Sequence, residues 1–118
     1  MEKADIVRGY FEAYRKGDRQ FLEDHFADDL TFTSPYDDRV DKTLYFERCW
    51  PGNERIKTNA VEKIFVEGDQ AFIRYKVITK DGTEFRNTEF WTFAGDQLKE
   101  VQVYFGATYK NGKFIKEK

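Results

Sequence analysis

The feature that most constrains the fold of this chain is a set of three turn signals at regular spacing in its second half. Each signal is a glycine next to an aspartate, a pair that is typical of tight hairpin turns. The signals lie 13 and 14 residues apart, at Gly68-Asp69, Asp81-Gly82 and Gly95-Asp96. They separate four predicted strands, over about residues 56–67, 70–80, 83–94 and 97–105. Strands joined by such short turns pair in antiparallel order, so we predict a four-stranded antiparallel meander.

The first half of the chain has a helical pattern instead. Apolar and aromatic residues recur three and four positions apart, which places them on one helix face: Ile6, Val7, Tyr10, Phe11 and Tyr14. Gly17 and Asp18 predict the end of this helix and the capped start of a second one. A short strand is predicted over residues 30–34, and a third helix runs from its cap, Asp41, to a break at residues 51–52.

This order of elements predicts an α+β fold in which helices cover one face of a sheet. The 118 residues suffice for one domain with its own core and are too few for two, so we expect a single domain over residues 1–118. Aromatic residues make up 18% of the chain and charged residues 36%. Many rings must therefore lie beneath a charged surface, either in a solid core or around a cavity.

Side-chain parity along the predicted strand 83–94 gives the clearest indication of a site. Alternate residues of a strand point to opposite faces of a sheet. The odd-numbered residues form the more apolar face: Phe85, Asn87, Glu89, Trp91 and Phe93. Asn87 and Glu89 interrupt this face, and a buried carboxylate needs a partner. The pattern is compatible with a ligand pocket that carries a few polar groups. It is equally compatible with a satisfied core network in which Glu89 pairs with a cation of a neighbouring strand, such as Arg74, Lys76 or Arg86.

Four segments of the chain form a series that extends from about Ile6 to Gly106. They are FADDLTFTSPYDD, the aromatic helix that leads into CWP, FRNTEFWTF and LKEVQVYFG. The series resembles the SnoaL-like proteins of the nuclear-transport-factor-two-like superfamily, which also contains the ketosteroid isomerases. The resemblance implies a cystatin-like cone, in which three N-terminal helices and a strongly curved antiparallel sheet enclose a pocket. Members commonly form homodimers through the outer sheet face, and their activities differ widely.

Three positions match catalytic residues of the ketosteroid isomerases, and one of them differs in residue type. Tyr10 matches the tyrosine that donates to the substrate oxyanion, and Glu89 matches a protonated aspartate that does the same. The general base of that family is an aspartate directly before a proline. Ser34 stands at this position, before Pro35, and serine is a poor base unless another group activates it. The resemblance therefore implies Tyr10 and Glu89 as catalytic candidates, without steroid isomerase activity.

Further residues are predicted to line the pocket. Asn87 would orient a ligand or bridge to Glu89, while Ser34 and Asp37 would lie at the pocket mouth. We expect the carbon skeleton of a ligand to contact aromatic residues: Tyr14, Phe32, Trp50, Trp91 and Phe105. Each of these residues also has a structural interpretation, because buried rings pack in cores and serine and aspartate form turns.

His25 and Cys49 are each the only residue of their type in the chain. We predict that His25 is a hydrogen-bonded core residue and that Cys49 is structural, since no histidine or basic run near it would activate its thiol. Asp37 and Asp38 could together hold a metal ion, but no further cluster of ligands accompanies them. We therefore expect no metal and no cofactor.

Composition narrows the possible partners and the location. Lys and Arg total 20 and Asp and Glu total 22, a net charge of -2 that argues against binding nucleic acid. No segment approaches the ~20 apolar residues of a membrane span, and the N terminus lacks the apolar core of a secretion signal. We expect a soluble cytoplasmic protein. Even-numbered strand residues such as Phe72, Ile78 and Phe90 would be exposed on a monomer, which predicts a homodimer.

Two functional hypotheses follow. The first is a pocket protein that binds or transforms a small, largely apolar molecule by cofactor-independent acid–base chemistry, such as isomerisation, dehydration or hydrolysis. The second is a non-catalytic homodimerising module in which Glu89 and Asn87 only satisfy the core. A cavity beside Glu89 would favour the first hypothesis, and a concave face filled solid by rings would contradict it.

Overall fold

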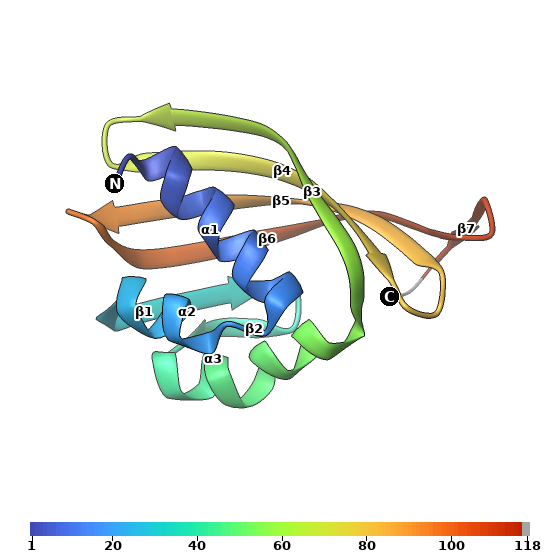
Figure 1. Cartoon of the computed structure of the whole chain (residues 1–118), viewed down its shortest axis with the longest axis horizontal. Helices are drawn as coiled ribbons and strands as arrows, with labels where there is room; N and C mark the ends of the chain where they lie inside the picture. Colours follow the sequence, from blue (N-terminus) through green and yellow to red (C-terminus); the bar gives the residue numbers. More distant parts are fainter. Residues whose placement is uncertain (117–118) are drawn as a thin grey trace.

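A computed structural model of the chain describes residues 1–116 and shows helices packed on one face of a curved sheet (Figure 1). Helices α1 (Lys3–Lys16), α2 (Arg19–His25) and α3 (Lys42–Arg48) precede a short 3-10 helix, η1 (Trp50–Arg55). The strands are β1 (Phe26–Ser34), β2 (Asp37–Val40), β3 (Ile56–Glu67), β4 (Gln70–Thr79), β5 (Thr83–Ala94), β6 (Gln97–Lys110) and β7 (Lys113–Ile115). The α+β fold and the three N-terminal helices predicted from the sequence are confirmed.

The sheet is mixed rather than wholly antiparallel. Its strand order is β2-β1-β6-β5-β4-β3, and β7 pairs with β6 beyond this path. Strands β3 to β6 form the predicted antiparallel meander. Strand β1 instead runs parallel to β6, and here the sheet departs from the predicted antiparallel order. Parallel neighbours need a long connection, and between β1 and β6 the chain passes through β2, α3, η1 and the other three strands of the meander.

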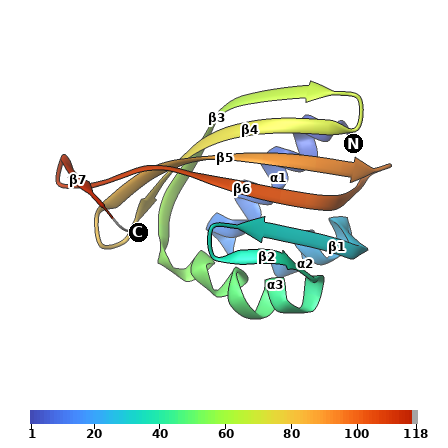
Figure 2. The ribbon, with the colours of Figure 1, turned by 180° about the vertical axis from the view of Figure 1, so that it is seen from behind.

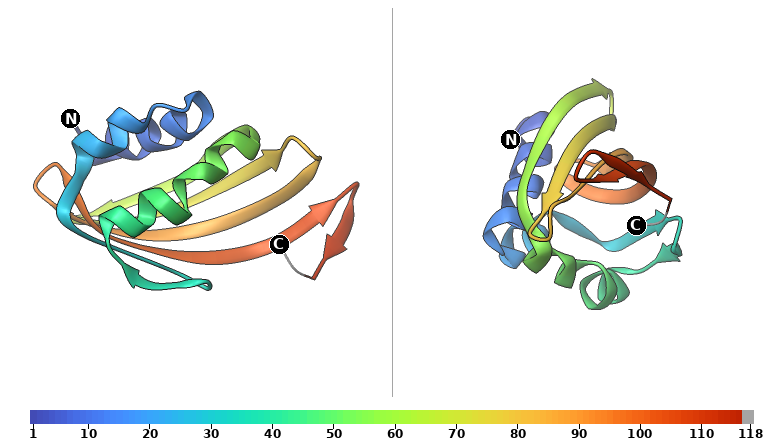
Figure 3. Two further views of the ribbon diagram at one scale, coloured as in Figure 1. Left: turned by 90° about the horizontal axis from the view of Figure 1, so that it is seen from below. Right: turned by 90° about the vertical axis from the view of Figure 1, so that its right-hand side faces the viewer.

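The helix boundaries follow the sequence signals closely. Gly17 has the left-handed φ of 71° that ends α1, and the Asp18 side chain then accepts a hydrogen bond from the Phe21 backbone at the start of α2. The Asp41 side chain accepts from the Leu44 backbone in the same way at the start of α3. Helix α1 lies across the concave face of the sheet, as Figure 3 shows.

Two strand features were not predicted. Strand β2 has only four residues and three of them are charged, so its sequence pattern indicates a turn rather than a strand. Strand β6 runs on to Lys110, past the predicted end near residue 105, and β7 returns beside it as a hairpin that projects from the body of the molecule (Figures 2 and 3). At Gly106 of β6, a Cβ atom would lie 2.2 Å from the Arg86 carbonyl oxygen. A close approach of this kind requires glycine.

The core lies between α1 and the concave face of β4, β5 and β6. Its most completely buried side chains include Val7 from α1, Ile73 from β4 and Trp91 from β5. The alternating burial along β5 places its odd-numbered residues on this inner side, as the parity argument predicted. Within residues 1–116, none of the helices combines the length and the apolar character that crossing a membrane would require.

Candidate functional site

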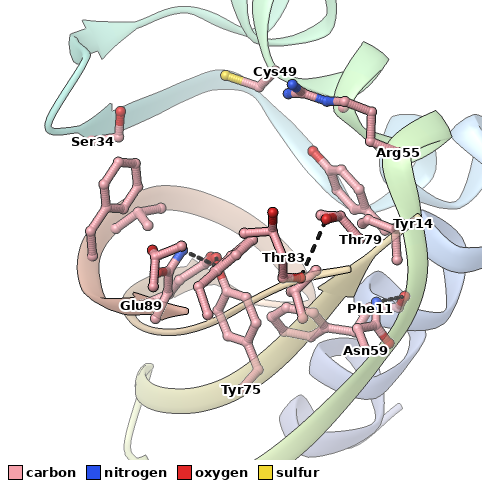
Figure 4. Close-up of a pocket in the computed structure, with 18 of the residues that line it drawn as sticks. Phe11, Tyr14, Ser34, Cys49, Arg55, Asn59, Tyr75, Thr79, Thr83 and Glu89 are labelled. Atoms are coloured by element: carbon pink, nitrogen blue, oxygen red, sulfur yellow. Dashed lines mark hydrogen bonds between the residues drawn. The ribbon is translucent and has the colours of Figure 1, made fainter. Parts of the chain in front are cut away.

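A cavity of about 670 Å³ opens between the concave face of the sheet and helix α1 (Figure 4). Buried side chains of α1, β4 and β5 form its inner wall, and exposed residues of α3, η1 and the β4–β5 turn surround its entrance. Eight of the ten residues predicted to be catalytic or to contact the ligand line this cavity: Tyr10, Tyr14, Phe32, Ser34, Asp37, Asn87, Glu89 and Phe105.

Glu89 lies on the inner wall of the cavity and is only 3% exposed. Its Oε2 accepts a hydrogen bond from the Tyr75 hydroxyl at 2.5 Å, and its Oε1 accepts one from Trp91 Nε1 at 2.8 Å. Asn87 Nδ2 in turn donates to the Tyr75 hydroxyl at 3.1 Å. All of these donors are neutral, so the carboxyl group is held in place without a compensating positive charge.

Burial raises the pKa of Glu89 above its usual range, because desolvation outweighs the hydrogen bonds from Tyr75 and Trp91 that favour the carboxylate. The cations of the neighbouring strands pair with other acids: Arg74 and Arg86 with Glu62, and Lys76 with Glu84. An ion pair therefore does not account for the buried position of Glu89. A carboxyl group in such surroundings can keep its proton at a higher pH than an exposed one.

Three tyrosine hydroxyls form a second polar cluster beside the cavity. The Tyr45 hydroxyl lies 2.8 Å from the Tyr10 hydroxyl and also hydrogen-bonds to that of Tyr14. Burial raises the pKa of all three above the ordinary tyrosine value, so each keeps its proton at neutral pH. A side-chain hydrogen bond between Tyr14 and Tyr10 also contributes to the pKa of Tyr14. The three hydroxyls therefore form one connected cluster.

A carboxylate lies near the entrance of the cavity, at the end of β1. Ser34 Oγ donates to Asp37 Oδ2 at 3.1 Å, and the Tyr36 backbone N–H donates to Ser34 Oγ at 3.1 Å. Arg48 Nη2 lies 2.7 Å from Asp37 Oδ1, and the Asp37 side chain is 8% exposed. The hydroxyl proton of Ser34 is thus used in the hydrogen bond to Asp37. The proton acceptor at the entrance of the cavity is therefore the Asp37 carboxylate rather than Ser34.

A model of the SnoaL-like domain matches residues 7–101. The chain belongs to the SnoaL-like family. No protein of curated function matches the sequence. The sequence resemblance noted above is therefore confirmed at the level of the family, while activity has to be argued from the site itself.

Solved structures with the same fold have low sequence identity to this SnoaL-like protein. A nuclear-transport-factor-two-like protein of unknown function from Cytophaga hutchinsonii is 19% identical, with a TM-score of 0.73 over 90% of this chain and 91% of that one. A protein from Jannaschia sp. CCS1, proposed to be a SnoaL-like polyketide cyclase, is 15% identical, with a TM-score of 0.73 over 87% and 84%. A protein from Streptomyces galilaeus, proposed to be a hydroxylase, is 14% identical, with a TM-score of 0.75 over 88% and 74%.

The two tryptophans of this SnoaL-like protein lie outside the set of side chains that line the cavity. Trp91 is fully buried behind Glu89 and serves it as a hydrogen-bond donor. Trp50 is half-buried and packs edge-on against Tyr14, with ring centroids 4.9 Å apart. Strand parity correctly predicted that Trp91 lies on the inner face of the sheet. It could not predict whether the side chain reaches the cavity or is buried beneath other side chains, because that depends on packing.

His25 and Cys49 occupy structural surroundings. His25 is half-buried, its Nδ1 lies 2.8 Å from the Phe21 carbonyl oxygen, and its ring stacks on that of Phe21. Burial raises the pKa of the Cys49 thiol to about 12, which disfavours the reactive thiolate. Within residues 1–116, no three acidic, histidine or cysteine side chains are grouped so that they could hold a metal ion.

Several residues that line the cavity were not singled out in the sequence, among them Arg55 and Thr108. Arg55 ends η1, in a segment that showed only a helix break, and no pattern marked it. Thr108 lies beyond the predicted end of the last strand, so no parity could be assigned to it. Thr108 is 3% exposed, and its hydroxyl oxygen has no hydrogen-bond partner among residues 1–116.

Proposed function

We propose that this SnoaL-like protein binds a small, largely apolar molecule in the cavity and transforms it by acid–base chemistry that needs no cofactor. The observation that carries the proposal is the Glu89 carboxyl group, buried on the wall of a cavity of about 670 Å³ and contacted only by neutral donors. A carboxyl group whose pKa is raised keeps its proton to a higher pH and can donate it to a ligand oxygen. The cavity volume is in the range of small-molecule sites.

The tyrosine cluster would supply a second donor to the ligand. Tyr10 and Tyr14 both line the cavity, and one of these hydroxyls would turn from its neighbour toward a ligand oxygen. Tyr10 is close enough to Glu89 for the carboxylate charge to contribute to the raised pKa of the tyrosine. A carbonyl oxygen bound near these groups would receive hydrogen bonds that strengthen as negative charge develops on it.

Asp37 is the proton acceptor in this proposal. A carbonyl compound bound with its oxygen at Glu89 would lose a proton from the adjacent carbon to the Asp37 carboxylate. The electron pair of that C–H bond would move to the carbonyl oxygen, giving an enolate that Glu89 and the tyrosines stabilise. Returning the proton to the same or another carbon completes an exchange or an isomerisation, with no further reactant.

Ligand binding is tested with 1-tetralone, a bicyclic ketone of mostly apolar surface. Trp91 donates to Glu89 and Trp50 packs on Tyr14, so we expect saturable changes in tryptophan fluorescence when the ketone binds. Tyr14→Phe should weaken binding, while Tyr104→Phe, on an exposed side chain of the outer face, should not. A fluorescence signal that does not saturate would contradict the proposal.

The chemistry is tested by exchange of the protons beside the carbonyl of 1-tetralone in deuterium oxide, followed by proton NMR. We expect the protein to accelerate exchange and Asp37→Asn to lower the rate about 100-fold or more. The matched control is Asp38→Asn, because the neighbouring Asp38 side chain is 92% exposed and should not matter. Equal rates for the two variants, or no acceleration by the unmodified protein, would contradict the proposed acid–base role.

A non-catalytic homodimerising module is the second candidate, and the outer face of the sheet favours it. Phe65, Phe72 and Tyr104 are at least half exposed there, and the Phe72 and Phe90 rings pack 4.7 Å apart. Apolar patches of this kind commonly mark an interface. Dimer formation and a cytoplasmic location are parts of this proposal, and dimer formation is compatible with either candidate. Light scattering should give the mass of two chains at micromolar concentration, reduced to one by Phe72→Glu, and a single-chain mass without the substitution would contradict the dimer.

A further inference from the structure

The entrance of the cavity carries positive charge that the acid–base proposal does not use. The lysines and arginines that line the cavity are all exposed, so positive charge is confined to its rim: Arg48, Arg55 and Lys80. Arg48 is neutralised by Asp37, 2.7 Å away. Arg55 and Lys80, in contrast, have no ion-pair partner within residues 1–116.

Most of the acidic residues at the same rim form ion pairs with a nearby lysine or arginine. Asp37 pairs with Arg48. Asp81 accepts hydrogen bonds from the Thr79 hydroxyl and the Thr83 backbone, which hold its pKa at about 2, and Lys110 lies 3.8 Å from it. Glu54 is then the one remaining acid that lines the entrance, against two unpaired cations. With Lys110 counted, which pairs with Asp81 but does not line the cavity, four cations stand against three acids at the rim, an excess of one positive charge.

The position of Arg55 directs this charge toward the opening. Arg55 Nη2 passes over Gly52, 3.8 Å from where a Cβ atom would stand, and the guanidinium points toward Cys49 across the entrance (Figure 4). The Lys80 backbone N–H donates to the Arg55 carbonyl oxygen at 2.9 Å, so both side chains leave the backbone at the same part of the rim. An arginine fork matches the two oxygens of a carboxylate or similar oxyanion.

Among the described residues, the inner end of the cavity has no lysine or arginine that could pair with an anionic group. The buried polar groups of the lining are the Glu89 carboxyl group, the side-chain amides of Asn59 and Asn87, and the hydroxyls of tyrosines and Thr108. The lysines and arginines of the lining are exposed. A group with a permanent negative charge would lose hydration beside the buried Glu89 without gaining a cation, which is unfavourable. A ligand with one charged end would consequently enter with its uncharged end first.

We propose that the ligand of this cavity is an amphipathic oxyanion, with an apolar ring body, a neutral oxygen at the inner end and a carboxylate or related anionic group held by Arg55 at the entrance. The inference rests on the proposed function, because it assigns the orientation and chemical class of the molecule bound in the same cavity. Lys80 adds positive charge beside Arg55, and the aromatic side chains Phe32 and Phe105 contact the ring body between the two ends.

The test compares 2-naphthoate with 2-naphthamide, which has the same ring and similar shape but no charge, by isothermal titration calorimetry at low salt. We expect the unmodified protein to bind 2-naphthoate about tenfold more tightly, as a charge-assisted hydrogen bond at a partly exposed site permits. Arg55→Gln should remove most of this preference and leave the affinity for the amide unchanged. The matched control is Arg8→Gln, which removes the same charge from an exposed residue outside the cavity and should keep the preference. A parallel titration with 2-naphthalenesulfonate distinguishes a carboxylate site from one for sulfur oxyanions.

The possible outcomes distinguish the oxyanion assignment from the proposed pocket function on which it rests. Equal affinity for acid and amide, or a preference that survives Arg55→Gln, overturns the oxyanion assignment while leaving the pocket function in place. Failure of the two naphthyl probes and the sulfonate to bind at all overturns the inference and counts against the pocket function as well. Tighter binding of either oxyanion that depends on Arg55 supports the inference.

Discussion

Glu62 and Glu89 belong to the same sheet and have opposite surroundings. Glu62, on the outer face of β3, receives two hydrogen bonds from Arg86, at 2.8 and 3.0 Å, and lies 3.3 Å from Arg74. These arginines lower the pKa of Glu62. Glu89, on the inner face of β5, is contacted by a hydroxyl and an indole N–H, and burial raises its pKa.

The contrast distinguishes the outer face of the sheet, where acids form ion pairs at the surface, from the inner face, which holds the candidate site. On the outer face, acids and bases are arranged in exposed pairs, which contribute little individually. On the inner face, an acid is kept in an apolar cavity although the chain has 20 lysines and arginines, and none of those within residues 1–116 pairs with it. A buried acid maintained at such a cost is a candidate for function. The following predictions test this difference between the two faces.

The largest effect is expected from truncating the ring that supports Glu89. Trp91→Ala removes a fully buried ring and one hydrogen-bond donor of the carboxyl group, so the free energy of unfolding should fall by about 3–5 kcal/mol. Phe72→Ala, at a ring that is 50% exposed on the outer face, should cost well under half as much in the monomer. Urea unfolding followed by circular dichroism measures both. Similar losses would show that the two faces do not differ in packing.

A smaller loss is expected from Tyr75→Phe, which removes the hydroxyl that donates to Glu89 Oε2. The free energy of unfolding should fall by about 1–3 kcal/mol, and the pKa of Glu89 should rise further because the carboxylate loses a donor. Arg86→Gln, which removes the partner of Glu62 on the outer face, should change stability much less. The comparison fails if Arg86→Gln is the more destabilising substitution.

The two glutamates should also give opposite slopes of stability against pH. The folded state retains the proton of Glu89 at pH values where the unfolded chain has lost it. The free energy of unfolding therefore falls as pH rises from the ordinary glutamate pKa, about 4.3, to the raised value, by about 1.4 kcal/mol for each unit of difference. Glu89→Gln places an uncharged side chain similar to the protonated acid at this position, so it should remove the decrease in the free energy of unfolding with rising pH. Glu62→Gln should instead remove a loss of stability at acidic pH, because the pKa of Glu62 is lowered. Urea unfolding from pH 3 to pH 8 would reveal a wrong sign at either position.

The smallest effect is expected at Thr108, whose buried hydroxyl has no partner among the described residues. Thr108→Val preserves the shape of the side chain and removes an unsatisfied polar group, so stability should change by less than about 1 kcal/mol or increase. The control is Thr79→Val, which removes a hydroxyl that donates to Asp81 and should lower stability and raise the pKa of Asp81. A large loss with Thr108→Val would indicate that a bound water satisfies the hydroxyl.

The sequence predicted those parts of the fold that depend on local signals. Gly17 and Asp18 marked the boundary between α1 and α2, and the glycine–aspartate pairs marked the turns of the meander, because each acts through the backbone of a few neighbouring residues. The parallel pairing of β1 with β6 could not be predicted in this way, since it joins segments about 70 residues apart and leaves no local pattern.

The site was predictable to a similar extent. Strand parity and the family resemblance placed Glu89 and Asn87 on the inner face, where both line the cavity. The residues that donate hydrogen bonds to Glu89 are determined by packing between strands, which strand parity does not reveal. Trp91 was therefore predicted to line the cavity, although it is fully buried and donates to the Glu89 carboxyl group. Arg55 was missed because the sequence shows a helix break at that point and does not show which way the side chain leaves it.

Carbon-13 NMR of the Glu89 side-chain carboxyl group, followed as pH is raised, tests the central claim most directly. The account predicts a pKa clearly above the ordinary glutamate value of about 4.3, with the Trp91 indole N–H resonance shifting over the same pH range because it donates to the same group. A pKa at or below the ordinary value, with no coupled change at Trp91, would contradict the account.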